Sequence, residues 1–281
     1  MIELLLALSL SAAAQAELQT VEVAVTDASG AALSGLVPEE VVVIENGVAR
    51  DVSRVERDDR QLRLAVLVDS SQAVGTAFRM RVVDAVAGFL ERLPAGSHYT
   101  LWVTGDRPEK RVGPTDDPGL GLRSLQRVAP QGGNTVLDGL VYATRELKAA
   151  EGERSVVVAV TSAGIEFSNR DRFQVVDQAL PGADLFEAVQ FDEGEADQDM
   201  QISYGYVLDA VTKRSGGLFE RVVSVMAVDG ALRRISGDIA GRYRISYATL
   251  ADIEKREIEV QVARPGAKVR LIPPRETAAG S

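Results

Sequence analysis

Residues 62 to 69 read LRLAVLVD, an almost unbroken apolar run that ends in an aspartate. Such a run predicts a strand buried on both faces, because a strand with one solvated face would alternate apolar and polar residues. A second run of this kind, SVVVAVTS, occupies residues 155 to 162. Strands buried on both faces need helices on both sides, so the two runs favour a parallel sheet within an α/β fold.

Helical patterns separate the apolar runs. After the first run, apolar residues recur every three or four positions and the pattern stops at Pro94; they are Phe78, Val82, Val86, Phe89 and Leu93. A second helical pattern begins near Thr135. Further strands are expected at 98–106, 185–191 and 218–222, and further helices before residue 180 and at 202–214 and 228–239. This alternation predicts a Rossmann-like, doubly wound, mostly parallel sheet over residues 61–242.

Both ends of the chain carry a different pattern. Residues 20–26 alternate apolar and polar side chains, and residues 41–45 lead into Asn46-Gly47, a strong hairpin signal. Residues 243–247, 258–262 and 269–271 also alternate. Neither set has enough apolar residues to fold alone. We therefore expect residues 17–60 and 243–272 to pair into one small β unit, followed by a tail at 273–281.

The first sixteen residues have the pattern of a signal peptide. An apolar core from Leu4 to Leu10 is followed by Ala14-Gln15-Ala16, a typical cleavage pattern, although Glu3 stands where a basic residue is usual. No later segment approaches the roughly 20 apolar residues that a membrane span needs. The pattern predicts a secreted or periplasmic protein whose mature form begins at Glu17.

Composition excludes several classes of function. A net charge of -10 argues against a nucleic-acid partner, and the absence of cysteine excludes disulfides, zinc-thiolate sites and thiol nucleophiles. The single histidine, His98, begins a strand whereas Ser71 follows one, so the two cannot form a catalytic relay. No glycine-rich phosphate motif opens a helix. The sequence therefore predicts a protein that is not an enzyme.

Three polar loops follow expected strands or lead into expected helices. They are DSSQA at 69–73, GGNTVLDGL at 132–140 and TSAGIEFS at 161–168. In an open α/β sheet such loops gather at the carboxyl ends of the strands, where ligands bind. The residues alone leave open whether they supply oxygen ligands to a cation or only a polar turn.

In this order the three loops resemble those of the von Willebrand factor type A domain. The flanking segments at 25–55, 241–249 and 258–270 resemble a bacterial secreted subgroup of these domains, so that the resemblance spans about residues 20–271. It implies protein ligands at the loop edge, bound through a metal-ion-dependent adhesion site. That site uses D-x-S-x-S on the first loop, Thr on the second and Asp on the third.

The resemblance implies an incomplete metal site. Asp69, Ser71 and Thr135 match the family ligands, but Ala73 replaces the second serine and Ser162 or Ala163 stands in place of the aspartate. Mg²⁺ prefers near-octahedral oxygen ligands with one or two carboxylates, and only one carboxylate remains unless Glu166 reaches in. We expect weakly bound Mg²⁺ or none. The alternative to a metal site is a hydrogen-bonded turn in which Asp69 and Ser71 cap the following helix.

An acidic run, FDEGEADQDM, follows the expected strand at 185–191. Its side chains Asp192, Glu193 and Glu195 are candidate contacts for a cation or a basic partner, against the simpler interpretation of a solvated loop. The sequence as a whole predicts an exported protein-binding, adhesion or scaffold module with a degenerate metal site. The alternative is a metal-independent, noncatalytic component of envelope assembly. A hydrolase that uses Asp69 and Ser71 would need a base that the sequence lacks.

Overall fold

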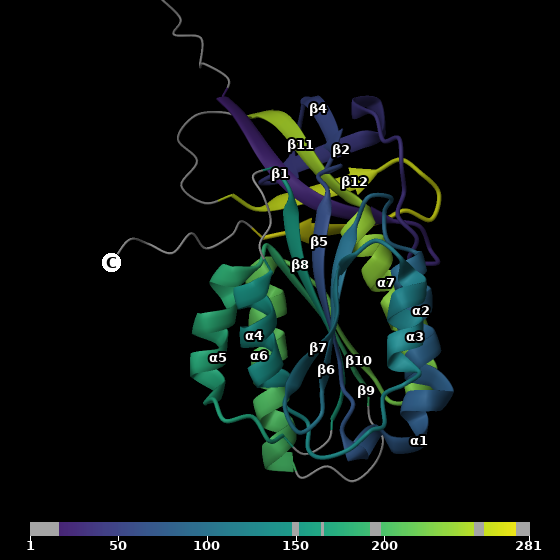
Figure 1. The fold of residues 1–281 in the computed structure, drawn as a ribbon. Coiled ribbons are helices and arrows are strands. Elements are labelled where there is room, and N and C mark those ends of the chain that lie inside the picture. Colours follow the sequence, from purple (N-terminus) through teal and green to yellow (C-terminus); the bar gives the residue numbers. More distant parts are fainter. Residues whose placement is uncertain (1–16, 148–151, 164–165, 192–197, 250–255, 274–281) are drawn as a thin grey trace, which may run out of the picture.

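The computed structural model describes residues 17–147, 152–163, 166–191, 198–249 and 256–273, which form a larger α/β unit and a smaller β unit (Figure 1). The larger unit is built on a six-stranded sheet of order β10-β9-β8-β5-β6-β7. Its strands are β5 (Leu62–Val68), β6 (His98–Thr104), β7 (Pro108–Thr115), β8 (Arg154–Ser162), β9 (Leu185–Phe191) and β10 (Phe219–Val222). All pairs are parallel except β6 with β7.

Helices cover both faces of this sheet, as Figure 1 shows. One layer contains α1 (Gly75–Ala77), α2 (Val83–Glu91), α3 (Pro118–Leu125) and α7 (Val228–Ala240), and the other contains α4 (Val136–Glu146), α5 (Arg172–Ala179) and α6 (Gln198–Ser215). A π-helical segment, Phe78–Val82, joins α1 to α2. Along β5, Leu64 and Val66 face the first layer, and Leu67 faces the second. The unbroken apolar run therefore fills two cores at once, and the predicted α/β fold is confirmed.

Two elements of the larger unit were not predicted. The edge strand β7 pairs with β6 through its backbone but leaves most of its side chains solvated, so it lacks apolar alternation. Helix α3 begins with Pro118-Gly119 and has an Asp117 side chain that accepts a hydrogen bond from Gly119 N. A helix this short, with two glycines, shows no clear apolar periodicity in the sequence.

The smaller unit contains strands from both ends of the chain. One antiparallel sheet has the order β13-β1-β11-β4 and the other the order β12-β2-β3. The strands are β1 (Glu17–Thr26), β2 (Val41–Glu45), β3 (Val48–Arg50), β4 (Val52–Arg57), β11 (Arg242–Thr249), β12 (Ile258–Val262) and β13 (Lys268–Ile272). Both sheets contribute to one core, with Val23, Val43 and Ile245 fully buried. The prediction of a small β unit from both termini is confirmed, and it has two sheets.

The hairpin between β2 and β3 has the predicted Asn-Gly turn. Asn46 has φ of 50° and Gly47 has φ of 78°, as the two central residues of a type I′ turn require. β2 also pairs with β12, from Glu45 opposite Ile258 to Val41 opposite Val262. The hairpin therefore joins the N-terminal strands to the C-terminal ones.

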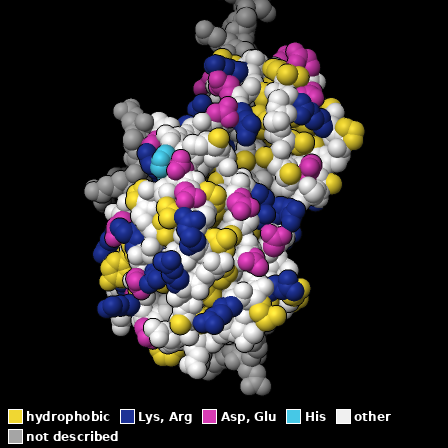
Figure 2. Space-filling model, turned by 45° about the vertical axis from the view of Figure 1, so that its right-hand side comes forward, with side chains coloured by type: hydrophobic (Ala, Val, Ile, Leu, Met, Phe, Trp, Pro, Cys, Tyr) yellow, Lys and Arg dark blue, Asp and Glu magenta, His cyan; other side chains and the backbone are white. Residues whose placement is uncertain are grey.

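The molecular surface mixes charges of both signs. Figure 2 shows acidic and basic side chains interspersed over the face that it presents, with no continuous basic stripe among the side chains drawn in colour. The face drawn there offers no continuous track for a phosphate backbone. Within the described ranges, no helix has the length and hydropathy needed to cross a membrane. The predicted signal peptide at 1–16 lies outside those ranges and stays a prediction.

Candidate functional site at the carboxyl edge of the sheet

The three polar loops meet at the carboxyl edge of the sheet, drawn at the bottom of Figure 1. The first loop begins at Asp69, directly after β5, and the third begins at the end of β8, where Ser162 lies. The second loop leads into α4 through Thr135, whose amide donates to the carbonyl of Thr104 at the end of β6. All four residues are buried. The structure therefore places Asp69, Thr135 and Ser162 at one edge of the sheet, as the loop positions predicted.

The carboxylate of Asp69 connects the three loops. Its Oδ1 accepts a hydrogen bond from Ser71 N at 2.8 Å. Its Oδ2 accepts three, from Asn134 Nδ2 at 2.9 Å, Ser162 N at 3.0 Å and Ser162 Oγ at 2.5 Å. Asp69 is 1% exposed, so these protein donors take the place of water. One buried carboxylate thus fixes its own loop, the loop before α4 and the loop after β8.

Asn134 is a site residue that the sequence analysis missed. Its Oδ1 accepts from Thr104 Oγ1 at 3.1 Å and from Val136 N at 3.0 Å. Its Nδ2 donates to Asp69 and, at 2.7 Å, to Thr161 Oγ1. The amide is fully buried and every donor and acceptor is used. The sequence did carry a signal for this site. Thr104 and Thr161 are hydroxyl residues at the ends of two buried strands, β6 and β8, which lie on either side of β5.

The hydroxyl groups of Thr135 and Ser71 are not directed at a shared ligand. Thr135 Oγ1 donates to the carbonyl of Gly105 at 2.9 Å. Ser71 Oγ is buried and has no hydrogen-bond partner among the described residues. Ser71 precedes the 3-10 turn Gln72–Val74, yet its side chain makes no capping bond. The prediction that Asp69 and Ser71 cap the following helix is therefore wrong, because Asp69 accepts from its own loop and from two neighbouring loops instead.

Burial dominates the electrostatics of this site. It raises the pKa of Asp69 above its ordinary value, although the hydrogen bonds from Ser162 and from Ser71 N act in the opposite direction. Glu166 also has a raised pKa, because of burial and the nearby charge of Asp138. Asp138 in turn pairs with Arg170, and its Oδ2 accepts from Asn169 N at 2.9 Å. The third loop is thus held against α4 by a second set of polar contacts.

The residues present do not fit the Mg²⁺ ion that the resemblance implies. Three hydrogen atoms already point at Asp69 Oδ2, and Ala73 supplies no oxygen. Glu166 accepts a hydrogen bond from Ser168 N at 2.7 Å, within its own loop. The part of the chain that the structure describes contains no group of three acidic or histidine side chains able to hold a metal. Among the family-matched hydroxyls, all of which lie in the described part of the chain, Ser71 Oγ is the one without a hydrogen-bond partner there, and one neutral hydroxyl is too little for a hard cation.

The remaining candidate residues are His98 and the acidic run. His98 begins β6 at the opposite edge of the sheet, where its ring nitrogen Nδ1 lies 3.1 Å from the carbonyl of Gly96. The candidate partner contacts Asp192, Glu193 and Glu195 fall outside the described residues, so their role stays a prediction.

The family model of the von Willebrand factor type A domain matches residues 64–165. One similar structure is a von Willebrand factor type A protein from Catenulispora acidiphila, 11% identical, with a TM-score of 0.54, covering 90% of this chain and 73% of that one. No curated protein matches the chain.

Two further structures share the fold. Proximal thread matrix protein 1 from the mussel byssus is 14% identical, with a TM-score of 0.53, and covers 70% of this chain and 50% of that one. Another structure of that protein has a zinc-occupied adhesion-site motif. The domain of the type V pili tip protein Mfa5 from Porphyromonas gingivalis is 10% identical, with a TM-score of 0.50, and covers 64% of this chain and 95% of that one. The family match over residues 64–165 and the shared fold support a von Willebrand factor type A domain in the α/β unit of this chain.

Proposed function

We propose that this chain is a noncatalytic protein-binding module, for adhesion or scaffolding, which presents its loops without a bound metal. The observation that carries the proposal is the four-donor shell of Asp69, which connects all three loops through protein groups alone. In a metal-dependent site the cation would organise these loops. Here a buried carboxylate, an amide and a serine do so, and the loops need no ion to keep their shape.

Exposed apolar side chains at the same edge support a protein ligand. Phe167 on the third loop is 58% exposed, and Val223 and Met226, which follow β10, are 93% and 61% exposed. Apolar side chains held outward at a rigid edge are typical of protein contact surfaces. The pili tip and byssus proteins with this fold are consistent with such a role.

The proposal includes export, which rests on the apolar residues 4–10 and the cleavage pattern at 14–16. N-terminal sequencing of the protein isolated from its native host should then find Glu17 first. Recovery of a cytoplasmic chain that begins at Met1 would remove this part of the proposal and leave the binding role intact.

The metal-independent part is tested by thermal melts in Mg²⁺ and in chelator. The wild type should melt at the same temperature in both. The double variant Ala73→Ser with Ser162→Asp restores the family ligands, and it also places a second carboxylate beside Asp69, where the two repel when no ion is present. It should be less stable than the wild type in chelator and regain stability in Mg²⁺. Strong stabilisation of the wild type by Mg²⁺ would contradict the proposal.

The binding role is tested by pull-down from envelope extract with three versions of the protein. Val223→Asn changes an exposed side chain at the carboxyl edge, and Val48→Asn makes the same change at an exposed position on β3. We expect the wild type and Val48→Asn to capture the same proteins with or without chelator, and Val223→Asn to capture less. Loss with Val48→Asn alone would favour the alternative, an envelope-assembly component that binds through its β unit. Loss in chelator alone would favour a metal-dependent site.

A further inference from the structure

A cleft of about 740 Å³ separates the β unit from the amino edge of the central sheet. Its walls come from β1, β11 and β13 on one side and from the beginnings of β8 and β9 on the other. The volume is in the range of clefts that hold small organic ligands. This cleft lies at the opposite end of the sheet from the Asp69 site, and the proposed function does not use it.

The cleft is rich in arginine although the protein is acidic. Five arginines line it against three acidic residues: Arg60, Arg154, Arg242, Arg244 and Arg256 against Glu22, Asp58 and Asp184. Counted over the lining alone, arginines exceed acids by two, in a chain whose net charge is -10; Asp238 and Glu45 lie behind the lining and pair with Arg242 and Arg256. An anion that enters the cleft would meet a positive local field.

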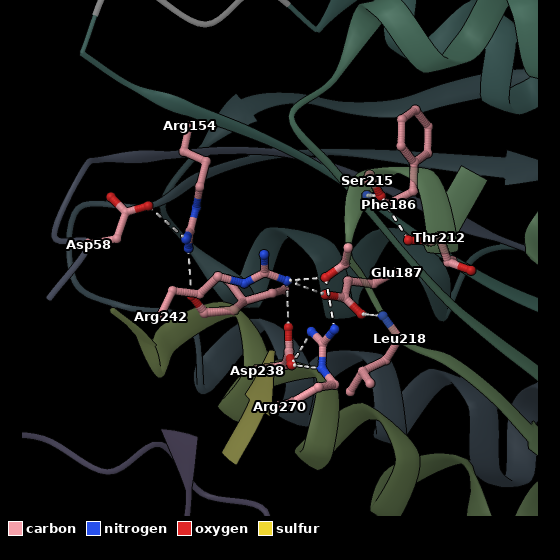
Figure 3. Close-up of polar contacts among 12 residues, drawn as sticks. Asp58, Arg154, Phe186, Glu187, Thr212, Ser215, Leu218, Asp238, Arg242 and Arg270 are labelled. Atoms are coloured by element: carbon pink, nitrogen blue, oxygen red, sulfur yellow. Dashed lines mark hydrogen bonds and ion pairs between the residues drawn. The ribbon is translucent and has the colours of Figure 1, made fainter. Parts of the chain in front are cut away.

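Behind this lining the carboxylates are shared, and Figure 3 shows this for Asp238, which contacts both Arg242 and Arg270. Asp58 accepts from Arg154 Nη1 at 3.1 Å and from Arg60 Nε and Nη2 at 2.8 Å each. Asp238 accepts from Arg242 Nη2 at 2.7 Å and from Arg270 Nε at 2.9 Å. Two carboxylates thus serve four guanidinium groups. A third acid of the network, Glu187, has one oxygen that lies 3.7 Å from Arg242 Nη2, beyond hydrogen-bond distance.

Two of the lining arginines are deeply buried and not fully satisfied. Arg154 is 4% exposed and Arg242 is 7% exposed, and the Nε of each has no acceptor within the described part of the chain. A guanidinium group has five N–H donors, and a buried donor without a partner is costly. Burial lowers the pKa of Arg154, which agrees with a cation that the protein compensates only in part.

The rest of the lining determines the class of ligand. Val21, Leu185, Ile258, Leu271 and Ile272 add apolar surface next to the arginines. Guanidinium groups bind carboxylate and phosphate oxygens through paired N–H donors, while apolar walls favour a hydrocarbon body. We propose that this cleft binds a small organic anion, in which a carboxylate or phosphate group is attached to an apolar body. Bound between the two units, such a ligand would also stabilise their packing.

Isothermal titration calorimetry on the full chain tests the proposal with four probes. Octanoate and phenyl phosphate combine an anion with an apolar body, 1-octanol lacks the charge, and inorganic phosphate lacks the body. We expect the first two to bind, with affinity that falls as salt rises, and the other two to bind at least about tenfold more weakly. Equal binding of octanol would overturn the role of the arginines. Equal binding of inorganic phosphate would mean an adventitious ion only, and no binding by any probe would overturn the proposal.

Variants locate the binding. Arg244 lines the cleft, is exposed and makes no ion pair within the described ranges, so Arg244→Gln should fold normally and weaken binding of the first two probes by about tenfold. The matched control is Arg54→Gln. Arg54 lies on β4 of the same sheet, 67% of its side chain is exposed, and it does not line the cleft. The control should bind like the wild type. An equal loss in both variants would show that general charge attracts the probes, and the proposal would fail.

Discussion

At the carboxyl edge of the sheet a single buried carboxylate, Asp69, receives four hydrogen bonds from neutral groups. At the amino edge Asp58 and Asp238 each serve two guanidinium groups, and the Nε atoms of Arg154 and Arg242 have no acceptor among the described residues. The first arrangement is saturated and holds loops in place. The second has more cations than the protein compensates. A saturated buried site has little left to offer a ligand, so the cleft at the amino edge is the better place to look for a small molecule.

The largest effect in this comparison should come from Asp238→Asn. It leaves the buried Arg242 and the partly exposed Arg270 without a full counter-charge, which should cost about 3 to 5 kcal/mol in the free energy of unfolding. The matched control is Asp229→Asn on the same helix. Asp229 pairs with Arg92 and Arg233 at the surface, so its loss should cost at most about 1 kcal/mol. Urea unfolding measures both, and similar costs would show that the amino edge is well solvated.

The second prediction concerns Glu187. Burial and the charge of Asp238 raise the pKa of Glu187 well above its ordinary value of 4.5, against the opposing charges of Arg242 and Arg270. A group with a raised pKa in the folded state favours folding at low pH, and that contribution is lost as the pH rises above the unfolded value. The wild type should therefore lose stability relative to Glu187→Gln as pH rises from about 5, by up to about 1.4 kcal/mol per pH unit.

Unfolding curves of the wild type and Glu187→Gln at several pH values measure this difference. Asp238 has a lowered pKa and stays ionised in both states over that range, so it does not contribute to the slope. Parallel pH profiles for the two proteins would mean that Glu187 is ionised in the folded state. The cleft would then carry less excess positive charge than its lining suggests.

The two edges also differ in how far the sequence predicted them. The Asp69 site was predicted because its loops follow apolar runs, and parallel strands bring their carboxyl ends to one edge. The donors were predicted less well: Asn134 was overlooked beside Thr135, and a capping role was assigned to Ser71. Hydrogen-bond direction depends on loop conformation, and residue order along the chain does not encode it. The identity of each donor therefore needed the structure.

The arginine network at the amino edge was not predicted at all. Asp58, Arg154 and Arg242 stand at the beginnings or ends of strands, where a charged residue is normally solvated. They meet only because the β unit packs over that edge. The sequence predicted that β1 and β11 belong to one β unit. It did not predict that this unit packs over the amino edge of the central sheet. Strand β7 was missed for a related reason, since an edge strand needs only backbone pairing and its side chains carry no pattern.

The third prediction addresses the saturated site. Ser162→Ala removes the hydroxyl that donates to Asp69 Oδ2 at 2.5 Å and leaves the backbone donor of the same residue in place. Loss of a hydrogen bond to a charged group should cost about 1.5 to 3 kcal/mol in the free energy of unfolding. Chemical denaturation measures this cost. A negligible change would mean that the remaining donors satisfy Asp69 and that Ser162 is free to serve another partner.

The smallest effect should come from Ser71→Ala, in the same loop. Ser71 Oγ is buried without a hydrogen-bond partner among the described residues, whereas Ser71 N donates to Asp69 and is unchanged by the substitution. Removing an unsatisfied buried hydroxyl relieves its desolvation cost, so the free energy of unfolding should stay within about 0.5 kcal/mol of the wild type or rise slightly. Unfolding is measured in chelator and in Mg²⁺, with Ser162→Ala as the positive control. A loss above about 1 kcal/mol in chelator would reveal a protein partner for this hydroxyl. A loss confined to Mg²⁺ would show that Ser71 still binds a cation, and that the carboxyl edge is not saturated.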